Sequence, residues 1–372
     1  MKILVLNVAA SSGGALSILN DFYNYVKEND QNNEWVFLLS TPKLKERENI
    51  KIINTPWIKK SWIHRLYWDL VEVRKIINNI KPDVILSLQN TRALGVDIPQ
   101  IIYLHQLIPF QETKNFSFLK KGEFMYAVYQ KIIGTLIKKS IKSANYTIVQ
   151  TDWLKNILIR KIKLNNDNIL VIPPSLNIPF CSEKEMEKVK ENINNKKTFF
   201  YPAKPLIYKN HMAIINGTKL LVNKGYSDFL IELTIDANGD KGPNTILEEM
   251  RFVKGQFNLT GFLEREEVLN KYKNSILIMP SYIESFCLPL EEAKRMGGMI
   301  LAPDLPYAKE VLKNYPNVLF FNPFDPKSLA NQMERILNND FNYRTMKIPE
   351  HKNVNSWNKL LELLKKIEKT SG

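Results

Sequence analysis

Short runs of apolar residues recur along the chain, and longer segments with helical apolar spacing separate most of them. This alternation predicts strands joined by helices, the order that builds parallel sheets with helices on both faces. Helices are expected notably at 16–28 and 66–79. Strands are expected at 2–7, 35–39, 83–87, 101–105, 146–150 and 169–172 in the first half, and at 198–203, 229–235, 258–261, 276–279, 299–302 and 318–321 in the second.

The chain of 372 residues is too long for one ordinary core and predicts two domains. Pro173 and Pro174 precede a polar stretch, 182–197, that predicts a linker followed by a helix. We expect an α/β protein with two Rossmann-like domains, residues 1–175 and 176–372. In sheets of this kind, ligands bind at the carboxyl ends of the strands.

Composition is that of a globular protein, with 44% hydrophobic and 24% charged residues. No run of 18 apolar residues appears, so a membrane-spanning helix is not expected. Residues 1–10 have the pattern of a short signal peptide, but Asn7 interrupts the apolar run, and we favour a first buried strand. The two cysteines, Cys181 and Cys287, fit a reducing compartment. We therefore expect a cytoplasmic protein.

Metal-binding patterns are missing from the sequence. The four histidines have no ligand spacing, and no Asp-x-Asp triplet occurs. We therefore expect no metal and no cofactor. His211 and His351 are interpreted as structural residues, and Asp304 as the N-cap of a helix with Pro306 near its start. Glu310 is interpreted as a surface group.

Positive charge is concentrated in the first half of the chain. The net charge is +14, and residues 1–175 hold 24 Lys and Arg against 14 Asp and Glu, whereas the remainder holds 28 against 24. The segments 57–65 and 131–142 mix basic with aromatic or aliphatic side chains, a pattern typical of contact with an anionic membrane. The alternative is a solvated basic face. No recognition motif accompanies the charge, so nucleic acid is not an expected partner.

Residues 280–293 (PSYIESFCLPLEEA) contain the most informative chemistry of the sequence. They join a predicted strand to a predicted helix in which Pro289 suits the first position, and Gly297 and Gly298 suit its end. A helix start has free N–H groups and attracts anions such as phosphate. Glu284 precedes this start and Glu292 follows it, and carboxylates accept hydrogen bonds from pairs of hydroxyls. The segment can therefore hold a sugar joined to a nucleotide.

This segment resembles the donor-site signature of glycosyltransferase family 4 (group 1), in which two carboxylates are separated by seven residues. The similarity continues through 302–311, and weaker similarity covers nearly the whole chain. The resemblance implies a GT-B fold with two Rossmann-like domains facing each other across a cleft. It also implies that the N-terminal domain binds the acceptor and the C-terminal domain the nucleotide sugar. A last helix, about 355–368, would return to the first domain. Cys287 departs from the family, which usually has Gly there.

Other donor-site residues follow from the same resemblance. Phe286, Cys287, Leu288 and Glu292 are expected to bind the donor. Lys204 and Lys209 follow a predicted strand with the spacing of the Arg and Lys that clamp the diphosphate in the family, although Lys replaces Arg at the first position. Without that context, two lysines in so basic a chain are unremarkable. Positive groups facing the leaving diphosphate would lower the barrier to transfer.

Three further positions lie at predicted strand ends. His105 has a counterpart in similar family members, so the resemblance implies contact with donor sugar or acceptor; the alternative is a structural hydrogen-bonding role. Gly13 and Gly14 follow the first strand and would touch donor phosphate or acceptor, although they also fit a plain turn. Gly261 and Phe262 match the family's residues beside the nucleotide base, or else form a turn that ends a strand. The expected catalytic residues are therefore His105, Lys204, Lys209 and Glu284.

The function implied by the resemblance is a retaining, metal-independent glycosyltransferase. It would move a sugar from a UDP- or GDP-linked donor to a glycan or lipid-linked acceptor in surface polysaccharide synthesis, either in the cytoplasm or peripherally on the inner face of the membrane. Two alternatives stay open. One is a GT-B enzyme of different chemistry, an epimerase or a phosphorylase, and the other is a non-catalytic basic protein that binds membrane surfaces.

Overall fold

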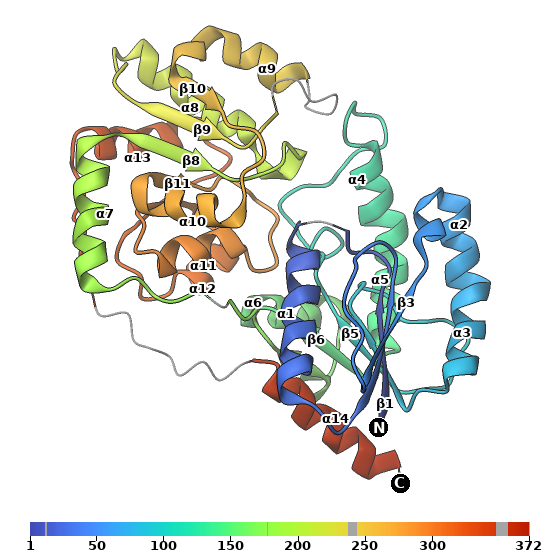
Figure 1. The fold of residues 1–372 in the computed structure, drawn as a ribbon. Helices are drawn as coiled ribbons and strands as arrows, with labels where there is room; N and C mark the ends of the chain where they lie inside the picture. The colour runs from blue at the N-terminus through green and yellow to red at the C-terminus, as the bar shows by residue number, and fades with distance from the viewer. Residues whose placement is uncertain (12, 177, 237–243, 347–355, 372) are drawn as a thin grey trace. The chain divides into compact units, whose positions relative to one another are not determined.

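The computed structural model describes the chain apart from residues 12, 177, 237–243, 347–355 and 372 (Figure 1). It divides into two compact units. Unit 1 comprises Met1–Leu176 and Asn353–Gly372, and unit 2 comprises Asn177–Lys352. The acceptor-binding and donor-binding roles implied for the two domains stay predictions.

The described part of unit 1 is built on a seven-stranded sheet, in the order β3-β2-β1-β4-β5-β6-β7, in which every pairing is parallel. Its central strands are buried on both faces, which explains their continuous apolar runs. The strands are β1 (Lys2–Asn7), β2 (Glu34–Leu39), β3 (Ile50–Asn54), β4 (Val84–Ser87), β5 (Gln100–Tyr103), β6 (Tyr146–Val149) and β7 (Ile169–Val171).

Helices cover both faces of this sheet. Leu19 and Phe22 of α1 (Gly13–Asn29) pack in the same core as β1 residues Ile3 and Val5. Core residues of α3 pack with Leu4 and Leu6, whose side chains point to the opposite face. The helices on the crossovers are α2 (Trp62–Tyr67), α3 (Val73–Ile80), α4 (Phe124–Val128), α5 (Gly134–Lys142) and α6 (Asp152–Ile162).

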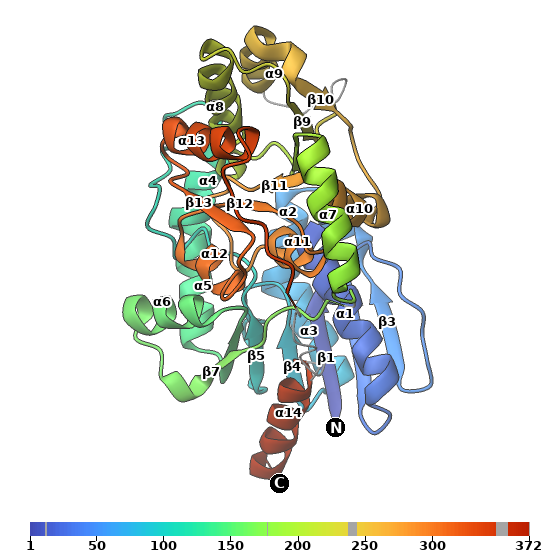
Figure 2. The same ribbon diagram turned by 90° about the vertical axis from the view of Figure 1, so that its left-hand side faces the viewer.

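Two long helices of unit 1 each contain a π-helical turn. Trp68–Glu72 joins α2 to α3, and Tyr129–Ile133 joins α4 to α5. The crossovers β3 to β4 and β5 to β6 run in the same direction along the sheet, so right-handed connections place both helices on the same face. They lie side by side in both views (Figure 1, Figure 2).

The last helix, α14 (Asn358–Ser371), belongs to the core of unit 1. Trp357, just before it, is fully buried and packs against Phe22 and Tyr103, with ring centroids 4.8 and 5.6 Å away. Its Nε1 donates a hydrogen bond of 2.7 Å to Asp21 Oδ2. The apolar spacing that predicted a helix at about 355–368 therefore supplies a stripe that closes one face of the first sheet.

Unit 2 repeats the plan with a six-stranded parallel sheet among its described residues, in the order β10-β9-β8-β11-β12-β13. Its strands are β8 (Thr198–Tyr201), β9 (Leu230–Leu233), β10 (Phe257–Leu259), β11 (Ile276–Ile278), β12 (Ile300–Pro303) and β13 (Val318–Phe321). Its helices are α7 (Glu183–Asn195), α8 (His211–Asn223), α9 (Asn244–Met250), α10 (Arg265–Asn274), α11 (Leu288–Arg295), α12 (Pro306–Val311) and α13 (Pro326–Leu337). The predicted α/β class is confirmed.

The sequence analysis missed β3 and misplaced one helix cap. β3 lies at the edge of its sheet and is only partly buried, so its apolar run is broken by Lys51. The predicted N-cap role of Asp304 is wrong: the cap of α12 is Leu305, and Asp304 instead forms an ion pair with Lys309. Pro306 occupies the first helical position, so the N-cap is Leu305 and Asp304 lies one position before it.

Candidate functional site

Two loops of unit 2 meet at the carboxyl edge of its sheet. One follows β8 and contains Lys204 and Lys209, and the other follows the neighbouring strand β11 and contains Glu284. The backbone N–H of Tyr282 donates a hydrogen bond of 3.1 Å to the carbonyl oxygen of Tyr208, and Ser281 Oγ lies 3.2 Å from the same oxygen. The two loops are therefore fixed to each other through the main chain.

Lys209 and Glu284 form a direct ion pair within this junction. The distance from Lys209 Nζ to Glu284 Oε1 is 2.5 Å, and Ser281 Oγ donates to the same oxygen at 2.6 Å. The Tyr201 hydroxyl donates to the carbonyl oxygen of Lys209 at 2.7 Å, which anchors the lysine backbone to the end of β8. Both side chains of the pair are mostly buried. The structure thus brings together two of the predicted catalytic residues.

The electrostatic setting keeps Lys209 charged. Burial by itself lowers the pKa of a lysine, but the Glu284 carboxylate beside it raises the pKa above its usual value. A permanently cationic ammonium held by a single carboxylate at a loop edge can accept an anionic ligand such as a diphosphate. Lys204 is exposed near the start of the same loop.

Cys287 is the N-cap of helix α11 and has a left-handed backbone, at φ +77° and ψ +80°. This conformation explains why glycine is usual at the position in the family, because a side chain there costs energy. The thiol is buried, and burial raises its pKa well above the usual value, with Glu284, Lys209 and Glu292 all close enough to influence it. Leu288 is the first helical residue and Pro289 the second, so Pro289 lies one position later than predicted.

Glu292 lies inside α11 and is held by two partners. Arg265 Nη2 donates to its Oε1, and the Tyr272 hydroxyl donates to its Oε2, both at 3.3 Å. Burial raises the pKa of this carboxyl, and the charge of Arg265 opposes that effect. Sequence reasoning missed Arg265 because a basic residue at the first position of α10 gives no signal of its own.

Four donor-site candidates of unit 2 remain: Phe286, Leu288, Gly261 and Phe262. Phe286 and Leu288 are half-buried on either side of Cys287. Gly261 follows β10 with φ +69° and open space around its Cα, and the Phe262 side chain is 84% exposed. Within the described part of the chain, no hydrogen bond or ion pair joins Gly261 or Phe262 to the Lys209–Glu284 pair. Their role beside a nucleotide base stays a prediction.

The candidate residues of unit 1 lie at the carboxyl edge of the first sheet. Gly13, at φ +65°, and Gly14 open helix α1 after β1. His105 follows β5, and its backbone N–H donates to Asn90 Oδ1 at 2.7 Å. Its ring packs on Tyr103, with centroids 4.7 Å apart, and burial lowers its pKa to about 4. His105 Nε2 is buried without a hydrogen-bond partner among the described residues, so a neutral ring nitrogen is left for a ligand.

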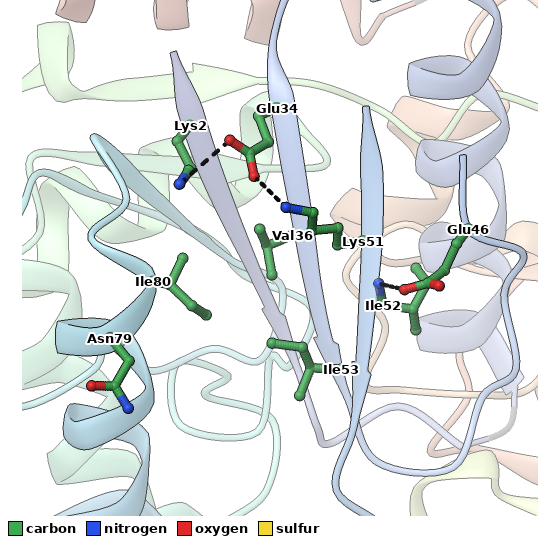
Figure 3. Close-up of a pocket in the computed structure, with 9 residues that line it drawn as sticks. All are labelled: Lys2, Glu34, Val36, Glu46, Lys51, Ile52, Ile53, Asn79 and Ile80. Atoms are coloured by element: carbon green, nitrogen blue, oxygen red, sulfur yellow. Dashed lines mark hydrogen bonds and ion pairs between the residues drawn. The ribbon is translucent and has the colours of Figure 1, made fainter. Parts of the chain in front are cut away.

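A hollow of about 370 Å³ lies elsewhere on unit 1 (Figure 3). It is found at the amino-terminal edge of the sheet, where Lys2 and Lys51 form ion pairs with Glu34 at 3.4 and 3.2 Å. None of the predicted site residues lines it. The cavity therefore adds nothing to the candidate site.

The described residues contain neither a metal-binding cluster nor a membrane-spanning helix. No group of three or more His, Cys, Asp or Glu side chains in the described chain could hold a metal ion. No described helix combines the length and the apolar character needed to cross a bilayer. Metal independence stays a prediction. His211 is buried and burial lowers its pKa to about 4, whereas His351 lies outside the described residues.

Two family models match most of the chain between them. Residues 182–354 match the model of the glycosyl transferases group 1, and residues 29–178 match that of glycosyltransferase family 4. The O-antigen chain mannosyltransferase RfbU of Salmonella typhimurium is 25% identical over 242 residues, which cover 64% of this chain and 60% of that protein. The match thus covers less than two thirds of the relative's length.

Solved structures share the fold. Sucrose-phosphate synthase from Thermosynechococcus elongatus superposes with a TM-score of 0.71 at 13% identity, covering 99% of this chain and 98% of that one. Anabaena Alr3699/HepE, solved in complex with UDP-glucose, superposes with a TM-score of 0.65 at 15% identity, covering 100% and 99%. The fold is GT-B, as predicted. The two family models together with the mannosyltransferase relative show that this chain belongs to the group 1 glycosyltransferases of family 4.

Proposed function

We propose that the protein is a retaining glycosyltransferase that moves a sugar from a nucleotide-diphosphate sugar to a glycan or lipid-linked acceptor. The observation that carries the proposal is the Lys209–Glu284 ion pair at the carboxyl edge of the second sheet, beside the start of α11. The relative RfbU is described as an O-antigen chain mannosyltransferase, which supports a role in surface polysaccharide synthesis. The donor nucleotide is UDP or GDP, and neither metal nor cofactor takes part.

In this mechanism the residues of unit 2 position the donor and neutralise charge. Lys209, together with Lys204, would face the diphosphate as it leaves, while the positive end of the α11 helix dipole adds to the potential. Glu284 would turn from Lys209 towards sugar hydroxyls, and Glu292 would accept hydrogen bonds from the ribose diol. Since the leaving diphosphate is itself basic, it would accept the proton of the incoming hydroxyl as the new glycosidic bond forms on the same face.

His105 contributes differently in this proposal. A low pKa keeps its imidazole neutral at pH 7, so the ring would orient a hydroxyl of sugar or acceptor and would not act as a strong base. The His105 ring is buried and packs against the ring of Tyr103. Gly13, at the same edge of the first sheet, leaves its backbone open to close approach of a phosphate or acceptor, and Gly14 follows it in α1.

The test is a panel of UDP- and GDP-sugars incubated with the full chain, with nucleoside diphosphate release followed by mass spectrometry. In parallel, a thermal-shift titration with UDP and GDP measures donor binding alone. A ligand at 100 times its Kd stabilises the folded state by ~2.7 kcal/mol, so one nucleotide should raise the Tm clearly. Lys209→Ala should abolish the shift. No stabilisation by either nucleotide, with no diphosphate released from any donor, would overturn the proposal.

Stereochemistry and acceptor need a second measurement. NMR of the product should show the anomeric configuration of the donor; inversion would contradict the retaining mechanism. Conversion of the nucleotide sugar without any acceptor would identify an epimerase instead. We further propose that the enzyme works in the cytoplasm at the inner face of the membrane, where lipid-linked acceptors are presented.

A further inference from the structure

Unit 1 exposes large apolar side chains where two of its helices begin. Leu119 is 96% exposed, Ile63 78% and Trp62 63%, and all three lie at or before the first turn of α2 or α4. Exposed apolar groups of this size, gathered on one part of a surface, mark a site of interaction. We call this group the basic apolar patch, defined by Trp62, Ile63, Leu66, Phe118, Leu119 and Phe124 together with the neighbouring lysines.

The two halves of the patch lie near each other. Helices α2–α3 and α4–α5 run side by side on one face of the first sheet, and both begin at its carboxyl edge (Figure 1). Burial raises the pKa of Tyr129 to about 12, and Arg65 of α2 is near enough for its charge to oppose this rise. The patch therefore forms a surface at the end of unit 1 that also holds Gly13 and His105.

Positive charge surrounds these apolar groups. Residues 114–142 contain seven lysines and a single acidic residue, Glu123, whose charge is already paired with Lys114 at 2.9 Å. Lys120 and Lys121 directly follow Leu119 and are exposed. Lys131 Nζ lies 5.0 Å from the ring centre of Phe118, which in turn packs against Phe124. Amphipathic groups of this kind place their apolar part in a membrane interface and their charge at the headgroups.

We propose that the basic apolar patch docks on the surface of an anionic lipid bilayer. Leu119 and Trp62 would enter the boundary between headgroups and acyl chains, while Lys120, Lys121 and Lys131 would lie against lipid phosphates. Charge complementarity favours this occupant, since a second copy of the chain would bring the same positive surface against itself. Docking needs no glycosyl transfer. The consequence that a lipid-linked acceptor is delivered to the edge holding His105 rests on the proposed function.

The experiment is flotation of the full chain with vesicles of phosphatidylcholine alone or mixed with phosphatidylglycerol. The wild type should float with the anionic vesicles, and added salt should weaken the binding because headgroup attraction is screened. Lys120→Glu combined with Lys121→Glu should weaken binding at least about tenfold. Leu119→Ser combined with Trp62→Ser should weaken it by about the same factor, through loss of buried apolar area.

Unit 2 provides matched controls. Lys188→Glu with Lys190→Glu reverses two exposed lysines on α7, and Phe252→Ser removes an aromatic ring that is 76% exposed and lies beneath Lys219. Both controls should float like the wild type. The proposal is overturned if they lose binding as strongly as the patch variants, or if the wild type ignores anionic vesicles. It is also overturned if light scattering shows a dimer that Leu119→Ser dissolves.

Failure of this inference can be separated from failure of the proposed function. Nucleoside diphosphate binding, followed by thermal shift in the absence of vesicles, should be unchanged in every patch variant. A patch variant that loses both flotation and nucleotide stabilisation is misfolded, and circular dichroism will identify it; Phe124→Ser then serves as the second apolar variant. Flotation by a chain that binds no nucleotide would support docking while removing the function proposed above.

Discussion

The two units share one architecture but use it differently. Each is a parallel sheet covered by helices, and each carries its candidate residues at the carboxyl edge of the strands. In unit 2 two of the candidates, Lys209 and Glu284, form an ion pair that Ser281 supports by a hydrogen bond. In unit 1 the candidates are a pair of glycines and a buried imidazole, beside an exposed basic apolar patch.

Charge follows the same division. Unit 2, residues 177–352, is nearly balanced, at 24 basic against 22 acidic side chains, whereas unit 1, residues 1–176 and 353–372, has 28 basic against 16 acidic. A balanced unit can hold one local cation for a specific anion, whereas a strongly basic surface attracts extended anionic partners. Because both units have the same fold, the fold does not decide which unit binds a specific anion and which attracts an extended anionic partner. The residues at the strand ends and on the helix surfaces decide this.

The largest expected effect is a loss of stability in unit 1 that leaves unit 2 unchanged. Trp357→Ala removes a fully buried indole from the core beneath α14, and we expect a loss of about 4 kcal/mol in the free energy of unfolding. All six tryptophans of the chain, at 35, 57, 62, 68, 153 and 357, belong to unit 1, so tryptophan fluorescence during urea unfolding measures that unit.

Unit 2 should keep its properties in that variant. Nucleotide binding, measured by calorimetry below the unfolding temperature, should be within twofold of the wild type. Phe252→Ala, which removes an exposed ring, should change stability by less than about 0.5 kcal/mol. Equal loss of nucleotide binding in Trp357→Ala would show that the two units do not behave independently.

The next effect concerns the ion pair of unit 2. Lys209→Met and Glu284→Gln should each reduce sugar transfer by about 100-fold or more, ~3 kcal/mol, because each removes a charge that the proposed mechanism places against the donor. Each single change also leaves a mostly buried charge without its partner, which costs stability, and the double variant should recover part of that cost. Transfer rates and urea unfolding of both singles and the double measure the two effects.

A second Lys–Glu pair in unit 2 provides the control. Lys219 and Glu249 also form an ion pair, but it lies away from the strand ends, between α8 and α9. Lys219→Met with Glu249→Gln should leave transfer within about twofold of the wild type, because surface pairs contribute little. If that variant were as inactive as Lys209→Met, the special role of the strand-end pair would be refuted.

The third effect compares a buried histidine in each unit. Burial lowers the pKa of both His105 and His211 to about 4. A histidine whose folded pKa is depressed below about 6.5 stabilises the protein above that value, and the stability is lost as pH falls towards 4. For the fully buried His211, this predicts roughly 2 kcal/mol lost between pH 7 and pH 5.

Urea unfolding at the two pH values measures this loss. Hydrogen exchange of unit 2 peptides reports His211, and tryptophan fluorescence reports His105. His211→Gln should remove the acid sensitivity of unit 2 alone, and His105→Gln that of unit 1 alone. His64→Gln changes an exposed ring on α2 and should leave both profiles unchanged. An unchanged acid profile for unit 2 in His211→Gln would contradict the assigned cause.

Much of this comparison could be predicted from sequence. The fold class followed from alternating apolar runs. Lys209 and Glu284 followed from the family resemblance, supported by their places after two predicted strands, and those strands turned out to be neighbours. Because parallel strands end at one edge of a sheet, the two residues can meet there. The basic segments 57–65 and 131–142 were also visible, but the most exposed apolar residue, Leu119, lies outside both.

Other features needed coordinates because they arise between distant segments. Arg265 reaches Glu292 across 27 positions of sequence, and Asn90 holds the backbone of His105 through its side chain. Neither residue lies in a recognisable pattern. β3 escaped prediction because an edge strand is only partly buried. Asp304 was assigned to a cap that Leu305 occupies, an error of the size expected at helix boundaries.

The smallest expected effect is at Cys287, where unit 2 has a side chain on a left-handed backbone and unit 1 keeps glycine, at Gly13. Cys287→Gly relieves a backbone cost of about 1 kcal/mol but frees the unfolded chain by a similar amount, so stability should stay within ~1 kcal/mol of the wild type. Cys287→Val should lose about 2 kcal/mol, since a β-branched side chain tolerates positive φ poorly. Hydrogen exchange of unit 2 peptides measures both. Equal stability of the Gly and Val variants would mean that the backbone at 287 is not left-handed, and the explanation for the family's glycine would fail with it.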